Sequence, residues 1–216
     1  MSYDLLSPVE ITSFCFHPEN ENVIIGGCLN GQVITWDLSS SEHRAGKPGQ
    51  KGEDEDNNQQ GNGKAYKQMV MSLIEKSHKA YVSDMAFVPG TVKVDRKNDN
   101  EGKSWHFVTV SEDGWLHIWD SRHVTKEALR EQEATNKIKP WIPFLQLQLF
   151  RLDGSPDLGI SRILFQPNQT TTTLWAGSFE GELLMIDWAV RPTVKEGAEG
   201  GDNEKQRAEN VQIYYD

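Results

Sequence analysis

The sequence predicts an all-β protein built from three four-stranded antiparallel sheets, and three observations support this prediction. First, residues 105–120 form a candidate hairpin of two strands rich in aromatic and β-branched side chains, joined by a Glu-Asp-Gly turn. Second, a turn glycine followed by a strand ending in aspartate recurs with the same spacing at 31–37, 114–120 and 181–187. Third, a strand that ends at Phe-x-Pro precedes each of these segments. Repetition of one unit determines the architecture before any single strand is assigned.

The hairpin carries apolar side chains on both faces of its second strand. Leu116 and Ile118 point to one side and Trp115 and Trp119 to the other, because side chains alternate along a strand. A sheet with one face in water would alternate apolar and polar residues instead. We therefore expect this hairpin to lie between two other sheets.

The first unit spans residues 9–75 and follows a lead-in at residues 1–8 without a clear pattern. Residues 39–65 lose almost every apolar side chain and gain Gly, Asn, Gln and charge. Such a composition cannot bury enough surface to offset its ordering entropy, so a disordered insertion is expected there. The predicted strands of this unit are a at 9–16, b at 22–27, c at 32–36 and d at 66–75.

The second unit spans residues 76–152 and contains the hairpin together with two insertions. Polar residues 90–104 separate strands a and b, and residues 121–143 follow strand c. The second insertion is expected to include a short helix that Thr125 caps. The predicted strands of this unit are a at 81–87, b at 105–111, c at 115–119 and d at 144–152.

The third unit spans residues 153–216, with a Gly- and charge-rich insertion at 191–207. Its strands are predicted at 160–165, 173–177, 182–186 and 209–215. In an antiparallel a-b-c-d sheet, the a–b and c–d connections lie at the same end. Every long insertion of the chain is an a–b or c–d connection, so all of them are expected on one rim of the molecule.

Composition excludes several classes of protein. The chain has 22 Lys+Arg against 32 Asp+Glu and a formal net charge of −10, which argues against nucleic-acid binding. Cys15 and Cys28 are too few for a disulfide scaffold or a zinc site, so buried reduced thiols are expected. The N-terminus lacks a signal-peptide pattern, and no apolar run approaches the length of about 20 residues that a membrane helix requires. A soluble intracellular chain is expected.

Phe-x-Pro, a Gly turn and a terminal Trp-Asp together resemble the repeats of WD-repeat β-propellers, which implies a WD40-type propeller. In the second unit His78, Thr109 or Ser111, Asp113 and Trp119 match the hydrogen-bonded tetrad of that family. The first unit departs from this pattern, because it keeps Trp36 but has Asn30 in place of the acid and no histidine. The third unit has Ala176, Glu180 and Ile186 at the equivalent positions.

Three units give an open arc, since propellers close with typically four to eight blades. We therefore expect the chain to be a fragment or a short isoform of a longer protein. A sharp cooperative melt of the isolated monomer without binding of a dye for exposed apolar surface would contradict this expectation.

The first unit carries a narrower resemblance. Residues 10–18 followed by residues 22–37, with their Ile-Gly-Gly-x-x-x-Gly-Gln core, resemble the first blade of dynein intermediate chains. Residues 139–146 and the lengths of the insertions resemble those of the axonemal inner-arm members. The resemblance implies a scaffold in the cytoplasm, cytoskeleton and ciliary axoneme that docks on a dynein heavy chain, together with other intermediate and light chains, and supports inner-arm assembly and motility. The alternative is a general cytoplasmic WD-repeat adaptor acting, for instance, on actin assembly or signalling complexes.

No catalytic, cofactor or metal site is expected, and neither is a small-molecule substrate. The tetrad accounts for His78, Asp113 and Trp119 without chemistry, and the six histidines lack the spacing of a zinc site. A hydrolase that uses His78 would remain an alternative only if His78→Ala abolished an activity without loss of the fold. Trp141, which lies between prolines outside any strand, and Trp115 and His117 are the candidates for protein contact, although aromatic residues at strand positions are more often part of a core.

Overall fold

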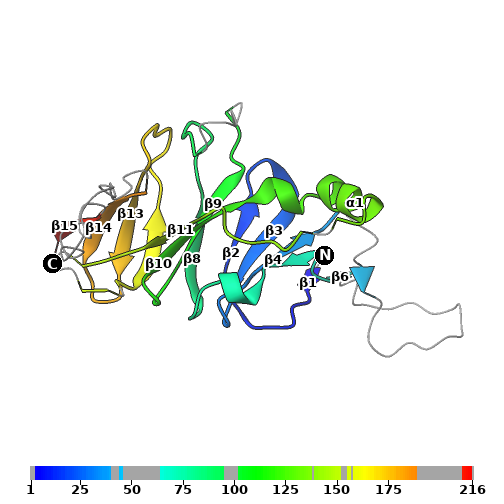
Figure 1. Cartoon of the computed structure of the whole chain (residues 1–216), viewed down its shortest axis with the longest axis horizontal. Helices are drawn as coiled ribbons and strands as arrows, with labels where there is room; N and C mark the ends of the chain where they lie inside the picture. The colour runs from blue at the N-terminus through cyan, green and yellow to red at the C-terminus, as the bar shows by residue number, and fades with distance from the viewer. Residues whose placement is uncertain are drawn as a thin grey trace, which may run out of the picture.

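Three four-stranded antiparallel sheets, the blades, stand side by side in an open arc (Figure 1). The structure is a computed structural model, and it describes residues 3–39, 44–45, 64–94, 102–137, 139–151, 155–156, 158–188 and 211–215. The predicted all-β architecture of three blades is confirmed. None of the helices in these ranges is long and apolar enough to cross a membrane.

Blade 1 agrees with the prediction except in its outer strand. Its strands are β2 (Ile11–His17), β3 (Asn20–Cys28), β4 (Val33–Asp37) and β7 (Val70–Met71), paired in that order. Strand d was predicted over 66–75, but only two residues pair with β4, and Ile74–Lys76 form the 3-10 helix η1. Beyond Ser72, whose N still donates to the carbonyl of Val33 in β4, the chain leaves the sheet, and Leu73 N donates to the carbonyl of Trp141.

Blades 2 and 3 follow the predicted order of strands. Blade 2 consists of β8 (Val82–Phe87), β9 (His106–Ser111), β10 (Trp115–Asp120) and β11 (Leu145–Gln148). Blade 3 consists of β12 (Ile160–Leu164), β13 (Thr173–Ser178), β14 (Leu183–Asp187) and β15 (Val211–Tyr215). Between β10 and β11 lie the 3-10 helix η2 (Ser121–Val124) and helix α1 (Lys126–Ala134). The predicted cap is present, since Thr125 Oγ1 accepts a hydrogen bond from Ala128 N.

The N-terminal segment, in which the sequence has no clear pattern, contains a strand. Strand β1 (Tyr3–Leu5) pairs in parallel with β6 (Lys64–Tyr66), and β6 pairs with β5 (Arg44–Ala45). Both ends of the insertion predicted to be disordered therefore contain strands, while residues 46–63 lie outside the described residues. The pairing joins segments far apart in sequence, and its short strands have no periodicity that a sequence pattern could reveal.

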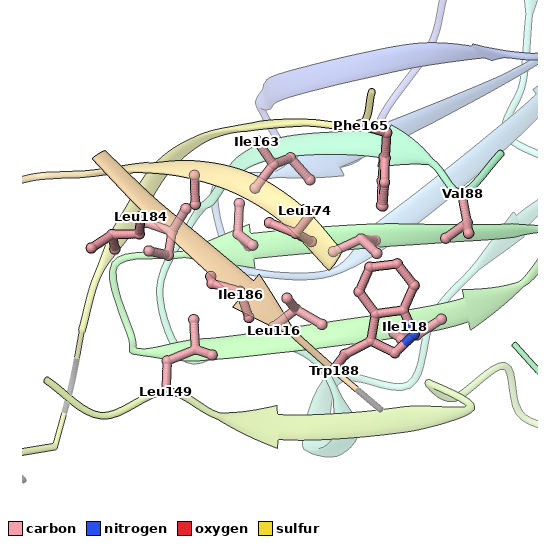
Figure 2. Packing of buried hydrophobic residues seen from close by; sticks show 14 of the residues in the cluster. Val88, Leu116, Ile118, Leu149, Ile163, Phe165, Leu174, Leu184, Ile186 and Trp188 are labelled. Carbon is pink, nitrogen blue, oxygen red and sulfur yellow. The ribbon is translucent and has the colours of Figure 1, made fainter. Parts of the chain in front are cut away.

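The central hairpin is buried on both faces, which confirms that it lies between two sheets. Leu116 and Ile118 belong to the cluster between blades 2 and 3, where they face Leu174 and Ile186 (Figure 2). On the opposite face Trp119 belongs to a second cluster, which lies between blades 1 and 2. Each blade therefore obtains its core from the blade beside it.

Alanine substitutions at the turn glycines of blades 1 and 3 should lower stability by different amounts. Gly31 and Gly181 both have positive φ, +84° and +98°, but a Cβ on Gly31 would overlap the carbonyl oxygens of His78 and Ala80, whereas a Cβ on Gly181 meets open space. Gly181→Ala should cost about 1–2 kcal/mol from backbone strain alone. Gly31→Ala should cost at least about 3 kcal/mol, because overpacking adds to that strain.

Urea unfolding followed by circular dichroism measures both effects. Equal losses of stability in the two variants would contradict the close contact between the turn of blade 1 and the segment that leads into blade 2.

Candidate functional site

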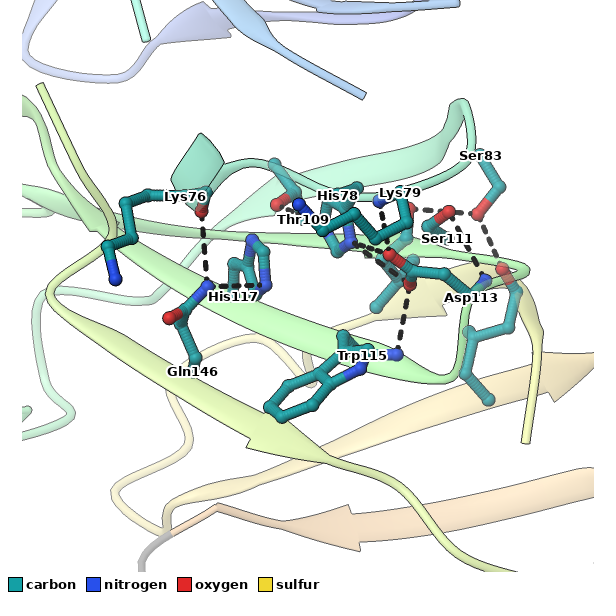
Figure 3. A network of polar contacts seen from close by, with 12 residues as sticks. Lys76, His78, Lys79, Ser83, Thr109, Ser111, Asp113, Trp115, His117 and Gln146 are labelled. Carbon is teal, nitrogen blue, oxygen red and sulfur yellow. Dashed lines mark hydrogen bonds and ion pairs between the residues drawn. The ribbon is translucent and has the colours of Figure 1, made fainter. Parts of the chain in front are cut away.

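A chain of buried hydrogen bonds ties the loop before blade 2 to strands inside that blade. His78 Nε2 lies 2.9 Å from Thr109 Oγ1, and Trp119 Nε1 donates to the same hydroxyl at 2.8 Å. On its other side His78 Nδ1 lies 3.2 Å from both carboxylate oxygens of Asp113 (Figure 3). Of the two candidate hydroxyls Thr109 occupies the tetrad, whereas Ser111 Oγ accepts from Asp113 N at 3.4 Å and shapes the turn.

The chemistry of these groups sets the direction of the chain. Because Trp119 can only donate, the Thr109 hydroxyl accepts from it and has its own proton to donate to Nε2 of His78. His78 Nδ1–H then donates to Asp113. The polar side-chain groups of His78, Thr109, Asp113 and Trp119 all have partners, which is what a buried network requires to be stable.

Asp113 is held as a carboxylate by the turn around it. Burial opposes its ionisation, but hydrogen bonds from His78, from Lys79 N at 2.7 Å and from Trp115 N at 3.1 Å outweigh burial and lower its pKa. One carboxylate thereby fastens the loop that enters blade 2 and the turn that follows β9. The site can fix these two segments relative to each other.

His117 extends the site by stacking on His78, with ring centroids 3.9 Å apart and planes 12° from parallel. Gln146 Nε2 donates to His117 Nε2, which places the remaining ring proton on Nδ1 (Figure 3). His117 is only 2% exposed, so its expected role as an exposed contact is wrong. Burial first, and then the neighbouring His78, lower the pKa of His117 to about 3.

Stability should therefore fall on acidification. The pKa of His117 is lower in the folded chain than the usual 6.5, so its contribution is complete above about pH 6.5 and is lost as the pH falls toward 3. Between pH 7 and pH 5 the loss is about 2 kcal/mol, because the unfolded chain gains a proton that the folded chain refuses. The His117→Leu variant has the leucine that blade 3 carries at the equivalent position, Leu184. Its free energy of unfolding should fall by about 2 kcal/mol less than that of the wild type over this pH range.

Urea midpoints at the two pH values test this difference. His17, whose pKa burial also lowers, is present in both proteins and cancels in the comparison. An equal loss of stability in wild type and His117→Leu would contradict the assignment.

Trp141 belongs to the core and not to the surface. It is 5% exposed and packs on Trp119 and Phe107, with centroids 5.3 and 6.1 Å away. Its Nε1 donates to the carbonyl of Asp120. The expectation of an exposed contact is wrong because the insertion folds back over the face of blade 2 that blade 1 leaves uncovered. Trp115 is half-buried, and its ring lies beside the ring of His117.

Blades 1 and 3 use other groups where blade 2 has its tetrad. Trp36 Nε1 donates to the carbonyl of Leu6 in the N-terminal segment, at 2.9 Å. Glu180 forms an ion pair with Arg151, which comes from the segment between blades 2 and 3. Each of these two blades is thus still bonded to the segment that precedes it, but among the described residues the tetrad is found in blade 2 alone.

A depression of about 220 Å³ lies between blades 1 and 2 on the rim predicted to carry the insertions. Val23, Ile25 and Val124 supply apolar lining, and the carboxylates of Asp37 and Glu127 supply negative charge. The other lining residues are His17, Glu19, Asn20, Ser39, Trp105, Ser121 and Thr125.

Contacts across this rim hold it together. His17 Nε2 lies 2.9 Å from Ser121 Oγ, and Glu19 accepts from Ser104 N at 2.9 Å. Sequence patterns missed this feature, because a turn of one blade and the insertion of the next form it jointly.

Both cysteines are free thiols. Burial raises the pKa of Cys15 to about 12, with Asp84 adding to the effect, and burial raises that of Cys28 to about 11. In the part of the chain that the structure describes, no group of three or more His, Cys, Asp or Glu residues could hold a metal ion.

Comparison with known proteins relates the chain to one family. Residues 3–151 match the model of the dynein axonemal intermediate chain 3 WD40 domain. Among curated relatives, a dynein axonemal intermediate chain 3 of Danio rerio is 27% identical over 243 residues, covering 85% of this chain and 25% of the relative. The protein of that name from Homo sapiens is 30% identical over 136 residues. That match covers 55% of this chain and 15% of the relative. The chain thus spans a quarter or less of the length of these relatives.

Two solved structures have a similar fold at low sequence identity. One is titled "Structure of U3-55K" and matches with a TM-score of 0.47 and 12% identity. The match covers 85% of this chain and 38% of the chain in that structure. Another is titled "Crystal structure of RRP9 WD40 repeats", with a TM-score of 0.48 and 12% identity, covering 85% and 37%.

Proposed function

The chain belongs to the dynein axonemal intermediate chain 3 WD40 domain family, and we propose that it is a non-catalytic scaffold that docks on a dynein heavy chain. In this role it supports assembly of the inner dynein arms and motility of cilia and flagella, in the cytoplasm and at the axoneme. The observation that carries the proposal is the family match, which extends from β1 through β11 and so includes all of blades 1 and 2. Other intermediate and light chains are further proposed partners.

The tetrad supports a scaffold better than an enzyme. His78 is 2% exposed, and both of its ring nitrogens are engaged, one with Asp113 and the other with Thr109. A general acid or base needs a nitrogen within hydrogen-bond reach of a substrate. An enzymatic activity that disappears in a folded His78→Ala variant would contradict this part of the proposal.

The rim between blades 1 and 2 is the surface that we propose for docking. It is concave, combines apolar lining with the exposed carboxylates of Glu19 and Glu127, and is framed by α1. Mixed surfaces of this kind favour partner segments that carry both apolar and basic side chains. The opposite rim holds a more open depression, of about 550 Å³, that includes Glu112.

Affinity capture from ciliated cells tests the function. The tagged chain should recover dynein heavy chain, identified by mass spectrometry. Glu127→Lys should reduce the recovery several-fold, because a reversed charge at the rim repels a basic segment. Glu112→Lys is the matched control, since it makes the same change at an exposed site on the other rim and should leave the recovery unchanged.

The outcomes test the proposed function separately from the proposed docking surface. Capture without any dynein heavy chain contradicts the proposed function, and capture dominated by actin-assembly or signalling proteins favours the general adaptor. Heavy-chain capture that both variants leave intact contradicts only the assignment of the rim.

A further inference from the structure

A buried carboxylate without a cation lines the depression between blades 1 and 2. Asp37, the last residue of β4, is 4% exposed and belongs to this lining. Its Oδ1 accepts hydrogen bonds from Ser39 N at 2.8 Å and from Ser39 Oγ at 2.6 Å. Among the described residues, Asp37 Oδ2 has no hydrogen-bond partner and the carboxylate forms no ion pair. Buried carboxylates are normally paired, so this oxygen is available to a ligand in the depression.

The equivalent carboxylate of blade 2 holds an arginine. Asp120 ends β10 as Asp37 ends β4, and Arg122 follows Asp120 by two residues. The Arg122 guanidinium donates to both carboxylate oxygens, with Nη2 2.6 Å from Oδ2. Blade 1 has Ser39 at the place of Arg122, and its hydroxyl reaches only one oxygen. The end of strand c therefore carries a complete ion pair in blade 2 and an unpaired charge in blade 1.

His17, which also lines the depression, does not supply the missing positive charge. Glu19 N donates to His17 Nδ1 at 3.1 Å, so the ring proton lies on Nε2. This proton is directed to Ser121 Oγ, and the Ser121 hydroxyl donates in turn to the carbonyl of Trp105 at 2.7 Å. Burial lowers the pKa of His17, although the charge of Glu19 opposes the shift. The imidazole is therefore neutral near pH 7.

The lining of the depression is otherwise acidic and apolar. It contains three carboxylates, of which Glu19 and Glu127 are exposed and Asp37 is buried, and neither lysine nor arginine. These carboxylates do not form a group that could hold a metal ion. A ligand that combines a positive charge with an apolar stem matches both parts of such a lining.

We infer that the depression receives one arginine side chain of the protein partner. This assignment rests on the proposed function, in which the same rim docks a partner segment with apolar and basic side chains. The guanidinium donates to Asp37 Oδ2 and pairs with Glu127, so it takes the place at Asp37 that Arg122 takes at Asp120. The methylene stem of the arginine packs on the apolar residues of the lining.

Arginine fits this lining better than lysine. A guanidinium is planar and carries several N–H donors, so it can pair with two carboxylates at once. It is also more weakly hydrated than an ammonium group, which lowers the cost of bringing it to a buried oxygen. Citrulline has nearly the shape of arginine but no charge, and it should not bind beside an unpaired carboxylate.

An NMR titration of the isotope-labelled 216-residue chain with Nα-acetylarginine amide tests the inference. Saturable shifts are expected for the amides of Val23, Ile25 and Asp37 and for the indole N–H of Trp105. A Kd of about 1 mM is expected for a ligand of this size. The lysine analogue should bind at least about threefold more weakly, and the citrulline analogue should not bind measurably.

Conservative variants test the role of each carboxylate. Asp37→Asn should weaken binding at least about tenfold, because it removes the buried charge. Its amide oxygen can still accept from Ser39, so the variant should keep the circular dichroism spectrum of the wild type. Glu127→Gln changes an exposed residue, should weaken binding about twofold, and provides a second test if Asp37→Asn does not fold. Glu112→Gln, on the other rim, is the control and should bind like the wild type.

Several results would overturn the inference. These are an absence of saturable shifts at about 50 mM probe, roughly fifty times the expected Kd, or unchanged binding by folded Asp37→Asn and Glu127→Gln. Equal binding of the citrulline or the lysine analogue would overturn it as well. None of these results affects the proposed function if the chain still captures dynein heavy chain. Conversely, arginine binding by a chain that captures no heavy chain contradicts the proposed function and supports the arginine site.

Discussion

Replacement of Trp119 with alanine should lower the free energy of unfolding by about 3–5 kcal/mol. The side chain is fully buried, stacks on Phe107 with centroids 6.2 Å apart, and contacts Trp141. Its loss leaves a cavity between blades 1 and 2 and removes the donor that Thr109 accepts. The change should therefore weaken both the tetrad and the packing between blades 1 and 2.

Trp115→Ala is the matched control for Trp119→Ala. Trp115 lies on the same face of β10 but is only half-buried, so its removal should cost about 1 kcal/mol. Urea unfolding followed by tryptophan fluorescence and circular dichroism measures both variants. A loss for Trp115→Ala as large as that for Trp119→Ala would contradict the difference in burial on which the prediction depends.

Thr109→Val should cost about 2–4 kcal/mol although it changes the volume of the side chain very little. The hydroxyl is hydrogen-bonded to both His78 and Trp119, and both partner atoms lie within 3 Å of it. Valine would leave two buried polar groups without partners, each at a cost of about 1–3 kcal/mol. The loss of stability therefore reports the hydrogen bonds of the tetrad and not a change in packing.

Thr35→Val makes the same chemical change in blade 1 with the opposite expectation. Thr35 is fully buried, and its Oγ1 has no hydrogen-bond partner among the described residues. Stability should be unchanged or rise by up to about 1 kcal/mol, because an unpaired hydroxyl is removed from the core. Equal losses for Thr35→Val and Thr109→Val would show that the tetrad contributes nothing beyond shape.

Repetition made most of the fold predictable from the sequence. Aligned glycines such as Gly114 and the Phe-x-Pro ends placed strands a, b and c of every blade, because period-2 alternation and turn chemistry act over a few residues. The tetrad was predictable for the same reason, since its four members occupy fixed places in one repeat. Alternation could not place the end of strand d in blade 1, where the chain leaves the sheet after Ser72 and Leu73 donates to an insertion from blade 2.

Features formed between distant segments were not predictable. Trp141 lies outside any strand, and its burial depends on how residues 121–143 fold back over Phe107 and Trp119. His117 has the alternation of a strand residue, but its stacking on His78 requires the loop before blade 2 to be in place. The rim between blades 1 and 2 likewise joins residues of two units, so no repeat contains it.

Hydrogen exchange of backbone amides tests most directly whether the three repeats build an arc whose middle blade is buried on both faces. Strands β9 and β10 should exchange most slowly, at the rate set by global unfolding, because no local opening exposes them. Strands β2 and β14, each in an end blade with one exposed face, should exchange faster. Exchange of β9 and β10 as fast as that of β2 and β14 would contradict the account.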